Sequence, residues 1–283
     1  MASRAEQKAA ARAAREARHR EIVASKQRRQ RLTVLGAILA VAVAAVVVAI
    51  VVSSGSSPAS TKAATKVSKS SAKTVAGYVN SDLDGIRQSG NLLGNPSAPV
   101  TVTEYGDLVC PVCADFAVTS EQQLITDEVR TGKVKLIYKA FDTASSYANQ
   151  SAFVTSQVAA LSAGLQDKEW NFILTTYFEQ PTTINGQDAE DVPYVTTSYL
   201  QSRASQIKGL NLINWQANLT SKKLANEVAA DLTAGDAAGV DKVGTPSILV
   251  SGPGGTEYYD QNGSESSPVP TIAQLQAMIT QSS

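Results

Sequence analysis

The chain has 283 residues and is 43% hydrophobic, which is enough for one large or two small domains with a buried core. Its formal net charge is zero, but residues 1–31 carry ten Lys and Arg against three Glu, whereas residues 74–283 carry eleven basic and twenty-two acidic side chains. The two ends are therefore expected to face different surroundings. With only two cysteines, the chain cannot be a scaffold held by several disulfides.

The basic tail of residues 1–31 leads into an apolar stretch at residues 32–52, whose last twenty residues carry no charge. About 20 such residues cross roughly 30 Å of hydrocarbon, so the stretch predicts a single transmembrane helix. The basic residues before it predict a cytoplasmic N-terminus, with the rest of the chain outside the cytoplasm. A cleavable signal peptide is the alternative, although its apolar region usually runs only about 7–15 residues. The tail could also attract nucleic acid, but its position beside the membrane favours a role in topology and contact with lipid.

Residues 53–77 are rich in Ser, Ala, Thr and Lys and contain few large apolar side chains. Such a segment buries too little surface to fold alone, so it predicts a flexible linker. We expect one folded domain over residues 78–283.

The first strand of that domain is predicted by the alternating sequence Val-Thr-Val-Thr-Glu-Tyr-Gly from Val100. Apolar residues at helical spacing follow as far as Gly132, and a second strand is expected over residues 134–141. A strand, a helix and a strand in this order favour parallel pairing of the two strands.

Residues 144–240 lack strand signals and show helical spacing instead, which predicts several packed helices. A third strand is expected over residues 247–251, directly after Gly-Thr-Pro. Residues 257–260 could pair with it as a hairpin, and residues 271–281 could form a closing helix.

Cys110 and Cys113 follow the first predicted strand as Cys-Pro-Val-Cys, at the expected start of the helix. Such a pair can alternate between dithiol and disulfide, because a helix N-terminus stabilises the first thiolate and the second thiol is within reach. A tetrahedral zinc site needs more ligands than the chain supplies, because its single histidine, His19, lies in the basic tail. The same histidine count excludes a Ser/His/Asp or Cys/His nucleophile in the outer domain. We therefore expect no metal and no organic cofactor.

The segment Glu-Tyr-Gly-Asp-Leu-Val-Cys-Pro-Val-Cys, followed far downstream by Gly-Thr-Pro, resembles the DsbA-like branch of thioredoxin-fold thiol-disulfide oxidoreductases. The resemblance covers roughly residues 93–280. It implies an α/β thioredoxin-like fold with an inserted helical domain at about residues 144–240, here preceded by the single N-terminal transmembrane helix.

The resemblance also implies a role for each matching residue. Cys110 corresponds to the exposed nucleophile and Cys113 to the resolving thiol, which together form the redox-active disulfide. Pro246 corresponds to a cis-proline opposite the cysteines, and Thr245 to a residue that contacts the bound substrate chain. From the residues alone, a trans proline that starts an edge strand is the alternative.

Glu104 lies six residues before the first cysteine, where the family carries an acid. Strand alternation places it on the face of Val100 and Val102, so it is expected to be buried, to have a raised pKa and to exchange a proton with Cys113. An exposed Glu near a strand end is the alternative.

Pro111 and Val112 lie between the cysteines and tune the pair. Pro111 suits the first helical turn, because its missing N–H removes no hydrogen bond there. The best-known oxidising members of the family have His at the place of Val112. A valine side chain cannot donate a hydrogen bond or carry charge. We therefore expect the Cys110 thiolate to be stabilised less than in those members.

The sequence thus predicts an enzyme that catalyses thiol-disulfide exchange on extracytoplasmic proteins, with disulfide formation as its main direction. It would be a single-pass protein of the cell membrane. By resemblance, a quinone-linked membrane thiol oxidase would restore its disulfide. One alternative is a thiol reductase or isomerase, for example in cytochrome maturation, and another is a non-catalytic binding or chaperone module with a redox switch. No nucleic-acid partner is expected.

Overall fold

The computed structural model describes residues 74–143, 149, 152–259 and 269–283. The predicted tail, the predicted transmembrane helix and residues 53–73 of the predicted linker lie outside this part, as do residues 144–148. Among the described residues, no helix combines the length and apolar character needed to cross a membrane.

A six-stranded sheet forms the centre of the described part, in the order β1-β2-β4-β3-β7-β8. Its strands are β1 Gln88–Ser89, β2 Leu92–Gly94, β3 Val100–Gly106, β4 Val134–Ala140, β7 Ser247–Gly252 and β8 Gly255–Tyr258. As the sequence predicts, β3 and β4 pair in parallel, while all other neighbouring strands are antiparallel. The hairpin turn lies at Pro253 and Gly254, so β8 begins before the expected residues 257–260.

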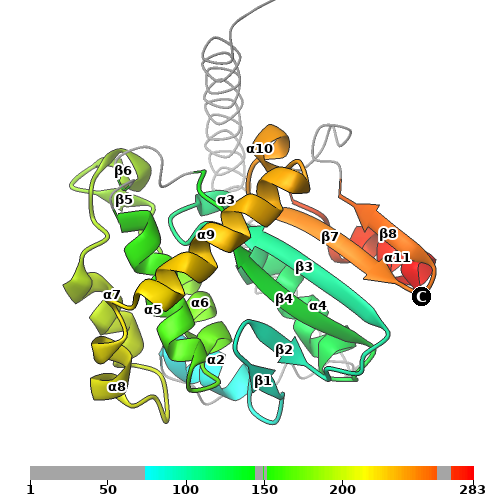
Figure 1. The fold of residues 1–283 in the computed structure, drawn as a ribbon, viewed down its shortest axis with the longest axis horizontal. Coiled ribbons are helices and arrows are strands. Elements are labelled where there is room, and N and C mark those ends of the chain that lie inside the picture. Colours follow the sequence, from blue (N-terminus) through cyan, green and yellow to red (C-terminus); the bar gives the residue numbers. More distant parts are fainter. Residues whose placement is uncertain (1–73, 144–148, 150–151, 260–268) are drawn as a thin grey trace, which may run out of the picture. The chain divides into compact units, whose positions relative to one another are not determined.

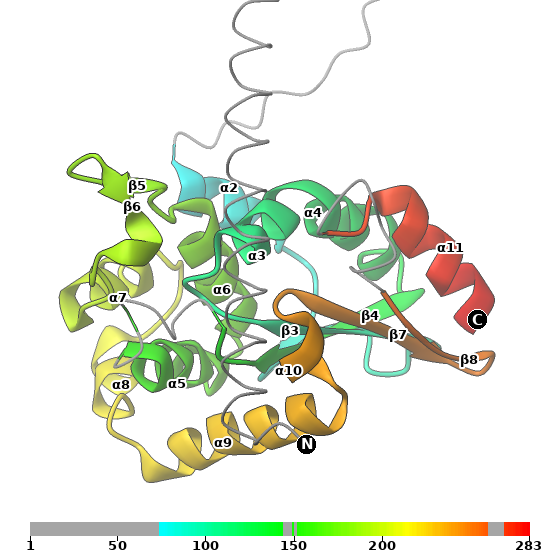
Figure 2. The same cartoon turned by 90° about the horizontal axis from the view of Figure 1, so that it is seen from above.

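Helices cover both faces of this sheet (Figure 2). On one face lies the helical run after the cysteines, which consists of α3 Pro111–Phe116, η1 Ala117–Glu121, α4 Gln122–Leu124 and η2 Ile125–Val129. The segments η1 and η2 are π-helical turns within this run. Also on this face is α11 Ile272–Ser282. Helix α9 Lys222–Ala237 crosses the opposite face (Figure 1).

The segment between β4 and β7 is mainly helical and packs beside the sheet, as predicted (Figure 1). Apart from α9, its helices are α5 Phe153–Gly164, α6 Glu169–Phe178, η5 Ala189–Asp191, α7 Thr197–Ala204, α8 Leu212–Ala217 and α10 Val240–Val243. The indole N–H of Trp170 donates to the Asn91 carbonyl at 2.9 Å, and that of Trp215 donates to the Ala159 carbonyl at 2.8 Å. Both large rings are therefore fully buried without an unpaired donor.

Two further details differ from the sequence-based expectation. The helical segment contains a small hairpin, β5 Thr183–Ile184 and β6 Gln187–Asp188, whose turn residues Asn185 and Gly186 both have positive φ. Asn-Gly is the preferred pair for such a turn, so the signal was present in the sequence.

The predicted linker also ends earlier than residue 77, because helix α2 spans Val75–Asp82. The Thr74 hydroxyl caps this helix by accepting from the Gly77 N–H at 3.1 Å.

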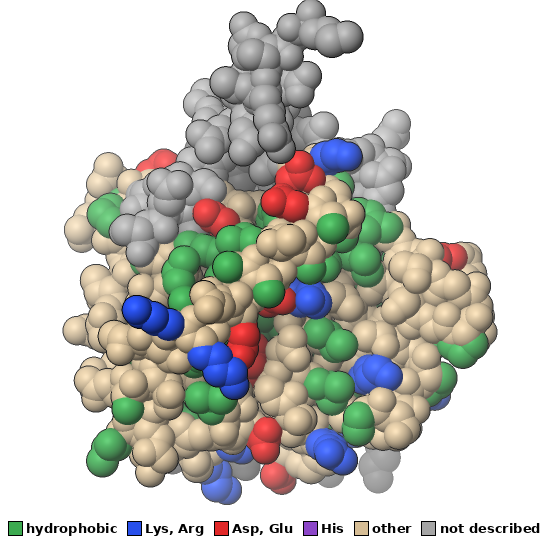
Figure 3. Space-filling view, viewed as in Figure 1, with side chains coloured by type: hydrophobic (Ala, Val, Ile, Leu, Met, Phe, Trp, Pro, Cys, Tyr) green, Lys and Arg blue, Asp and Glu red, His purple; other side chains and the backbone are tan. Residues whose placement is uncertain are grey.

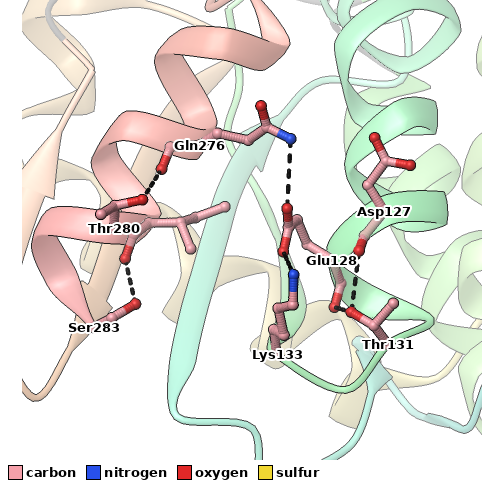
Figure 4. A network of polar contacts seen from close by, with 8 residues as sticks. Asp127, Glu128, Thr131, Lys133, Gln276, Thr280 and Ser283 are labelled. Atoms are coloured by element: carbon pink, nitrogen blue, oxygen red, sulfur yellow. Dashed lines mark hydrogen bonds and ion pairs between the residues drawn. The ribbon is translucent and has the colours of Figure 1, made fainter.

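Polar contacts hold α11 against the end of the helical run (Figure 4). The Glu128 carboxylate forms an ion pair with Lys133 at 3.2 Å and accepts a hydrogen bond from the Gln276 amide at 3.4 Å. The Thr131 hydroxyl donates to the carbonyls of Asp127 and Glu128 and closes the last turn of the run. The helix that begins at the cysteines is therefore anchored at its far end as well.

Helix α9 approaches the sheet closely at Gly235, where a Cβ atom would stand 2.3 Å from Cδ2 of the buried Phe141 ring. We expect Gly235→Ala to lower the free energy of unfolding by about 1–2 kcal/mol, because overpacking costs about 1–3 kcal/mol and exceeds the gain in helix propensity of at most about 1 kcal/mol. Denaturant unfolding measures this change. The exposed Asp236→Ala on the same helix should change stability by no more than about 0.5 kcal/mol, and an equal effect of both variants would contradict the close approach.

Candidate active site

The two cysteines stand at the point where β3 gives way to the helical run. Cys110 is the residue just before α3, with Pro111 in the first turn, and the Ala114 N–H donates to the Cys110 carbonyl at 3.1 Å. Both cysteines are thiols in this structure. Cys110 retains 5% of its surface exposed and Cys113 none, so only Cys110 presents any surface to another molecule.

The loop before β7 faces Cys110, although it lies far away in sequence. Its Thr245–Pro246 peptide bond is cis, as the family resemblance implied. The Cys110 thiol donates a hydrogen bond to the Thr245 carbonyl, with 3.5 Å between sulfur and oxygen. The structure therefore brings together the four residues that the sequence analysis assigned to exchange and to substrate contact.

Asp107 connects these loops and was not singled out by the sequence analysis. Its carboxylate accepts from the Val109 N–H at 3.0 Å and from the Thr143 N–H at 3.1 Å, and its carbonyl accepts from the Cys110 N–H at 2.9 Å. The Thr143 hydroxyl in turn shares a hydrogen bond with that of Thr245. An Asp whose carboxylate accepts from the backbone N–H two residues later commonly forms a turn. The position of Asp107 between the predicted strand and the cysteines could therefore have indicated this turn.

Glu104 lies beneath the cysteines and is 2% exposed, which confirms the burial expected from strand alternation. Apart from the Glu121 carboxyl, no group among the described residues forms a hydrogen bond with either of its carboxylate oxygens. Burial raises the pKa of Glu104 well above its ordinary value, and the nearby carboxyl of Glu121 raises it further.

The pKa of the Cys113 thiol is also raised well above its ordinary value, first by burial, then by the neighbouring Cys110 and by Glu104. Cys113 is therefore held as a neutral thiol when the pair is reduced. A buried acid close to a buried thiol is the arrangement that proton exchange between them requires.

Gly106 allows other side chains to approach Glu104. A Cβ atom at Gly106 would stand 2.6 Å from Cε2 of Tyr138, 2.7 Å from the Tyr177 hydroxyl and 3.0 Å from Oε1 of Glu104. The two buried tyrosine hydroxyls lie 3.4 Å apart, within hydrogen-bond distance of each other. Helical and strand periodicity indicate only that both tyrosines belong to the core, so the sequence assigns neither a role.

Pro111 and Val112 are partly exposed between the cysteines, and Val112 packs its side chain against the core. Val112 offers no polar group to either sulfur, as the sequence indicated. In the part of the chain that the structure describes, no group of three or more His, Cys, Asp or Glu side chains is arranged to hold a metal ion.

Comparison with known proteins agrees with this geometry. The family model described as thioredoxin matches residues 87–265, which include Glu104, both cysteines and the cis Thr245–Pro246 bond. The chain belongs to the thioredoxin family.

Three related proteins indicate which thioredoxin-family members are similar. A curated protein of Bacillus cereus, named probable disulfide bond formation protein D, is 29% identical over 164 residues, or 56% of this chain and 69% of that protein. The crystal structure of oxidised BdbD from Bacillus subtilis has a TM-score of 0.55 and 20% identity over 69% of this chain and 95% of its own. The crystal structure of DsbA from Chlamydia trachomatis has a TM-score of 0.53 and 16% identity over 68% of this chain and 90% of its own. At these identities the two crystal structures establish the thioredoxin-like fold with a helical insertion.

We expect Asp107→Ala to lower the free energy of unfolding by about 2–3 kcal/mol, because it removes charge-assisted hydrogen bonds and leaves the buried Val109 N–H without an acceptor. Denaturant unfolding of the reduced protein measures the loss. Asp84→Ala is the matched control, because the Asp84 side chain is exposed, and it should change stability by no more than about 0.5 kcal/mol. Equal stabilities of the two variants would show that Asp107 does not hold the loops together.

Proposed function

We propose that this thioredoxin-family protein is a DsbA-like thiol-disulfide oxidoreductase that forms disulfides in other proteins. The observation that carries the proposal is the Cys110 thiol at a helix start, 3.5 Å from the carbonyl that precedes a cis-proline, with the buried Cys113 and Glu104 behind it. The family match and the similarity to a probable disulfide bond formation protein agree with that chemistry.

The proposed reaction starts from the disulfide form of the two cysteines. A substrate thiolate attacks the Cys110 sulfur, the bond between Cys110 and Cys113 breaks, and Cys113 leaves and takes up a proton. A second thiolate of the substrate then attacks the substrate sulfur that is bonded to Cys110. A disulfide forms within the substrate, and Cys110 is released as a thiolate. The substrate dithiol is oxidised and the cysteine pair is reduced, so electrons balance without a cofactor.

Each site residue has a role in this proposal. Cys110 is attacked because it is the only one of the two cysteines with exposed surface, and Cys113 resolves the mixed disulfide in the reverse direction. Thr245 and Pro246 bind the substrate chain beside Cys110, and Glu104 exchanges the proton of Cys113. Pro111 starts the helix, while Val112 leaves the Cys110 thiolate without a polar side-chain neighbour between the cysteines.

The substrates are proposed to be protein thiols, approached through the surface around Cys110. Apolar side chains gather on the upper part of the face in Figure 3, on the side where α3 and α10 lie in Figure 1. Such a surface favours contact with an unfolded chain, which exposes apolar residues while its cysteines are still reduced.

We also propose that the protein is anchored in the cell membrane by residues 32–52, with its N-terminus in the cytoplasm and the described domain outside. The uncharged stretch, the basic residues before it and the linker-like composition of residues 53–73 support this topology. A membrane thiol oxidase that passes electrons to quinone is the proposed partner that restores the disulfide.

A reductase or isomerase is the second candidate. The observation that favours it is Val112, which provides none of the polar stabilisation of a Cys110 thiolate that would make the pair strongly oxidising.

A trapping experiment tests the exchange reaction. We expect Cys113→Ser to accumulate mixed disulfides through Cys110 when a reduced, unfolded secreted protein is added together with oxidised glutathione, because the buried resolving thiol is missing. Cys110→Ser should trap none, because the remaining sulfur is inaccessible. Non-reducing electrophoresis and mass spectrometry of the linked peptides measure both results.

Two controls accompany this experiment. Cys113→Ala avoids a buried hydroxyl and must trap substrate as well, while the variant without either cysteine must trap none. If neither Cys113 variant forms a mixed disulfide and the wild type leaves the reduced substrate unchanged, the protein is not an exchange catalyst.

A further inference from the structure

Glu121 is a second buried acid beside the redox pair, and the reaction outlined above does not use it. It is 1% exposed and lies at the end of the π-helical turn η1, eight residues after Cys113. One of its carboxylate oxygens has no hydrogen-bond partner among the described residues. A buried acid without such a partner is costly, so its position needs an explanation.

The π-helical turn determines where Glu121 points. In a continuous α-helix, eight residues make about 2.2 turns, which would place Glu121 about 80° around the helix from Cys113. A π-helical turn takes more residues per turn than an α-helical one, so η1 removes much of this excess rotation. Glu121 is thereby brought toward the side of the helix on which Cys113 faces Glu104.

The two carboxyl groups influence each other directly. The Glu121 carboxyl raises the pKa of Glu104 in addition to the effect of burial, while burial raises the pKa of Glu121 itself to about 7 and a hydrogen bond with Glu104 lowers it. Because a carboxyl donates only when protonated, this hydrogen bond requires a proton on one of the two acids.

The other groups around this acid pair provide no positive charge. The titratable neighbours that affect Glu104 or share its surroundings are Cys110, Cys113, Asp107, Tyr138 and Tyr177. In the described part of the chain, no Lys or Arg forms an ion pair with Glu104 or Glu121. Two close carboxylates without a cation cannot both ionise easily, so the pair retains a proton.

We infer that Glu121 is a positioning residue of the redox site, which shares a proton with Glu104 and so keeps that proton available to Cys113 at neutral pH. The inference rests on the proposed exchange function. When substrate thiolate breaks the bond between Cys110 and Cys113, the Cys113 sulfur takes this proton from Glu104, and the acid pair becomes more negative by one charge. When Cys113 attacks in the reverse direction, its proton returns to the pair.

The test is the rate at which the oxidised full chain is reduced by a small dithiol between pH 5 and pH 9. Burial and repulsion by Glu121 together keep Glu104 protonated, and Glu121→Gln removes the repulsion, so Glu104 should lose its proton at a lower pH than in the wild type. The rate relative to wild type at the same pH cancels the titration of the attacking dithiol. This ratio should be near one at the acid end of the range and fall severalfold as the pH rises through the region in which Glu104 loses its proton.

Glu169→Gln is the matched control. Glu169 is also a buried acid with an oxygen that lacks a partner, and burial, with Asp231 and Glu227 nearby, raises its pKa to about 8, but neither cysteine affects it. Its removal should leave the rate ratio near one at every pH. A flat ratio for Glu121→Gln in an active protein, or an equal fall for Glu169→Gln, would overturn the role of Glu121.

A second measurement needs no variant, in case Glu121→Gln does not fold. The infrared difference spectrum between disulfide and dithiol forms of the wild type at pH 7 should contain a band of a protonated buried carboxyl that changes with the redox state. A spectrum without this band would overturn the shared proton. If the wild type exchanges no disulfides at all, the proposed function fails first, which the trapping experiment reveals separately.

Discussion

The carboxylate of Asp107 accepts hydrogen bonds from the backbone N–H groups of Val109 and Thr143, and so fixes the turn on which both cysteines stand. This turn brings the end of β3, the end of β4 and the loop before β7 to one place, although they are far apart in sequence. Cys110 ends this turn, precedes α3 and donates its thiol hydrogen bond to the Thr245 carbonyl. A shift of the turn would therefore move the sulfur away from the cis-proline loop.

Burial then sets the chemistry of the groups that this turn positions. Cys110 lies at the start of α3 and retains some exposed surface, so it is the cysteine that a substrate can approach. Cys113 and Glu104 lie deeper, and burial raises the pKa of each, so both favour their neutral forms. Disulfide exchange requires this difference, since one sulfur must react at the surface while the other gains and loses a proton out of contact with water.

The sequence predicted the parts of the site that follow from local pattern. Strand alternation predicted the burial of Glu104, and the spacing of Cys110 and Cys113 after that strand predicted their place at the helix start. The cis bond at Pro246 came only from the family resemblance, because an isomer leaves no periodic signal. Strands β1 and β2 were missed because two or three residues are too few to show alternation. Glu121 was missed because α-helical spacing would rotate it away from Cys113, and the π-helical turn is a feature of the folded chain.

The most direct test of disulfide formation is the reduction potential of the Cys110–Cys113 couple, measured at pH 7 by equilibrating the full chain with defined ratios of reduced and oxidised glutathione. With Cys110 at a helix start but Val112 beside it, the potential should lie between the value of thioredoxin, about −270 mV, and that of the strongest oxidant of the fold, about −120 mV. A potential at or below about −270 mV would make the protein a reductant and contradict its assignment as a disulfide-forming enzyme.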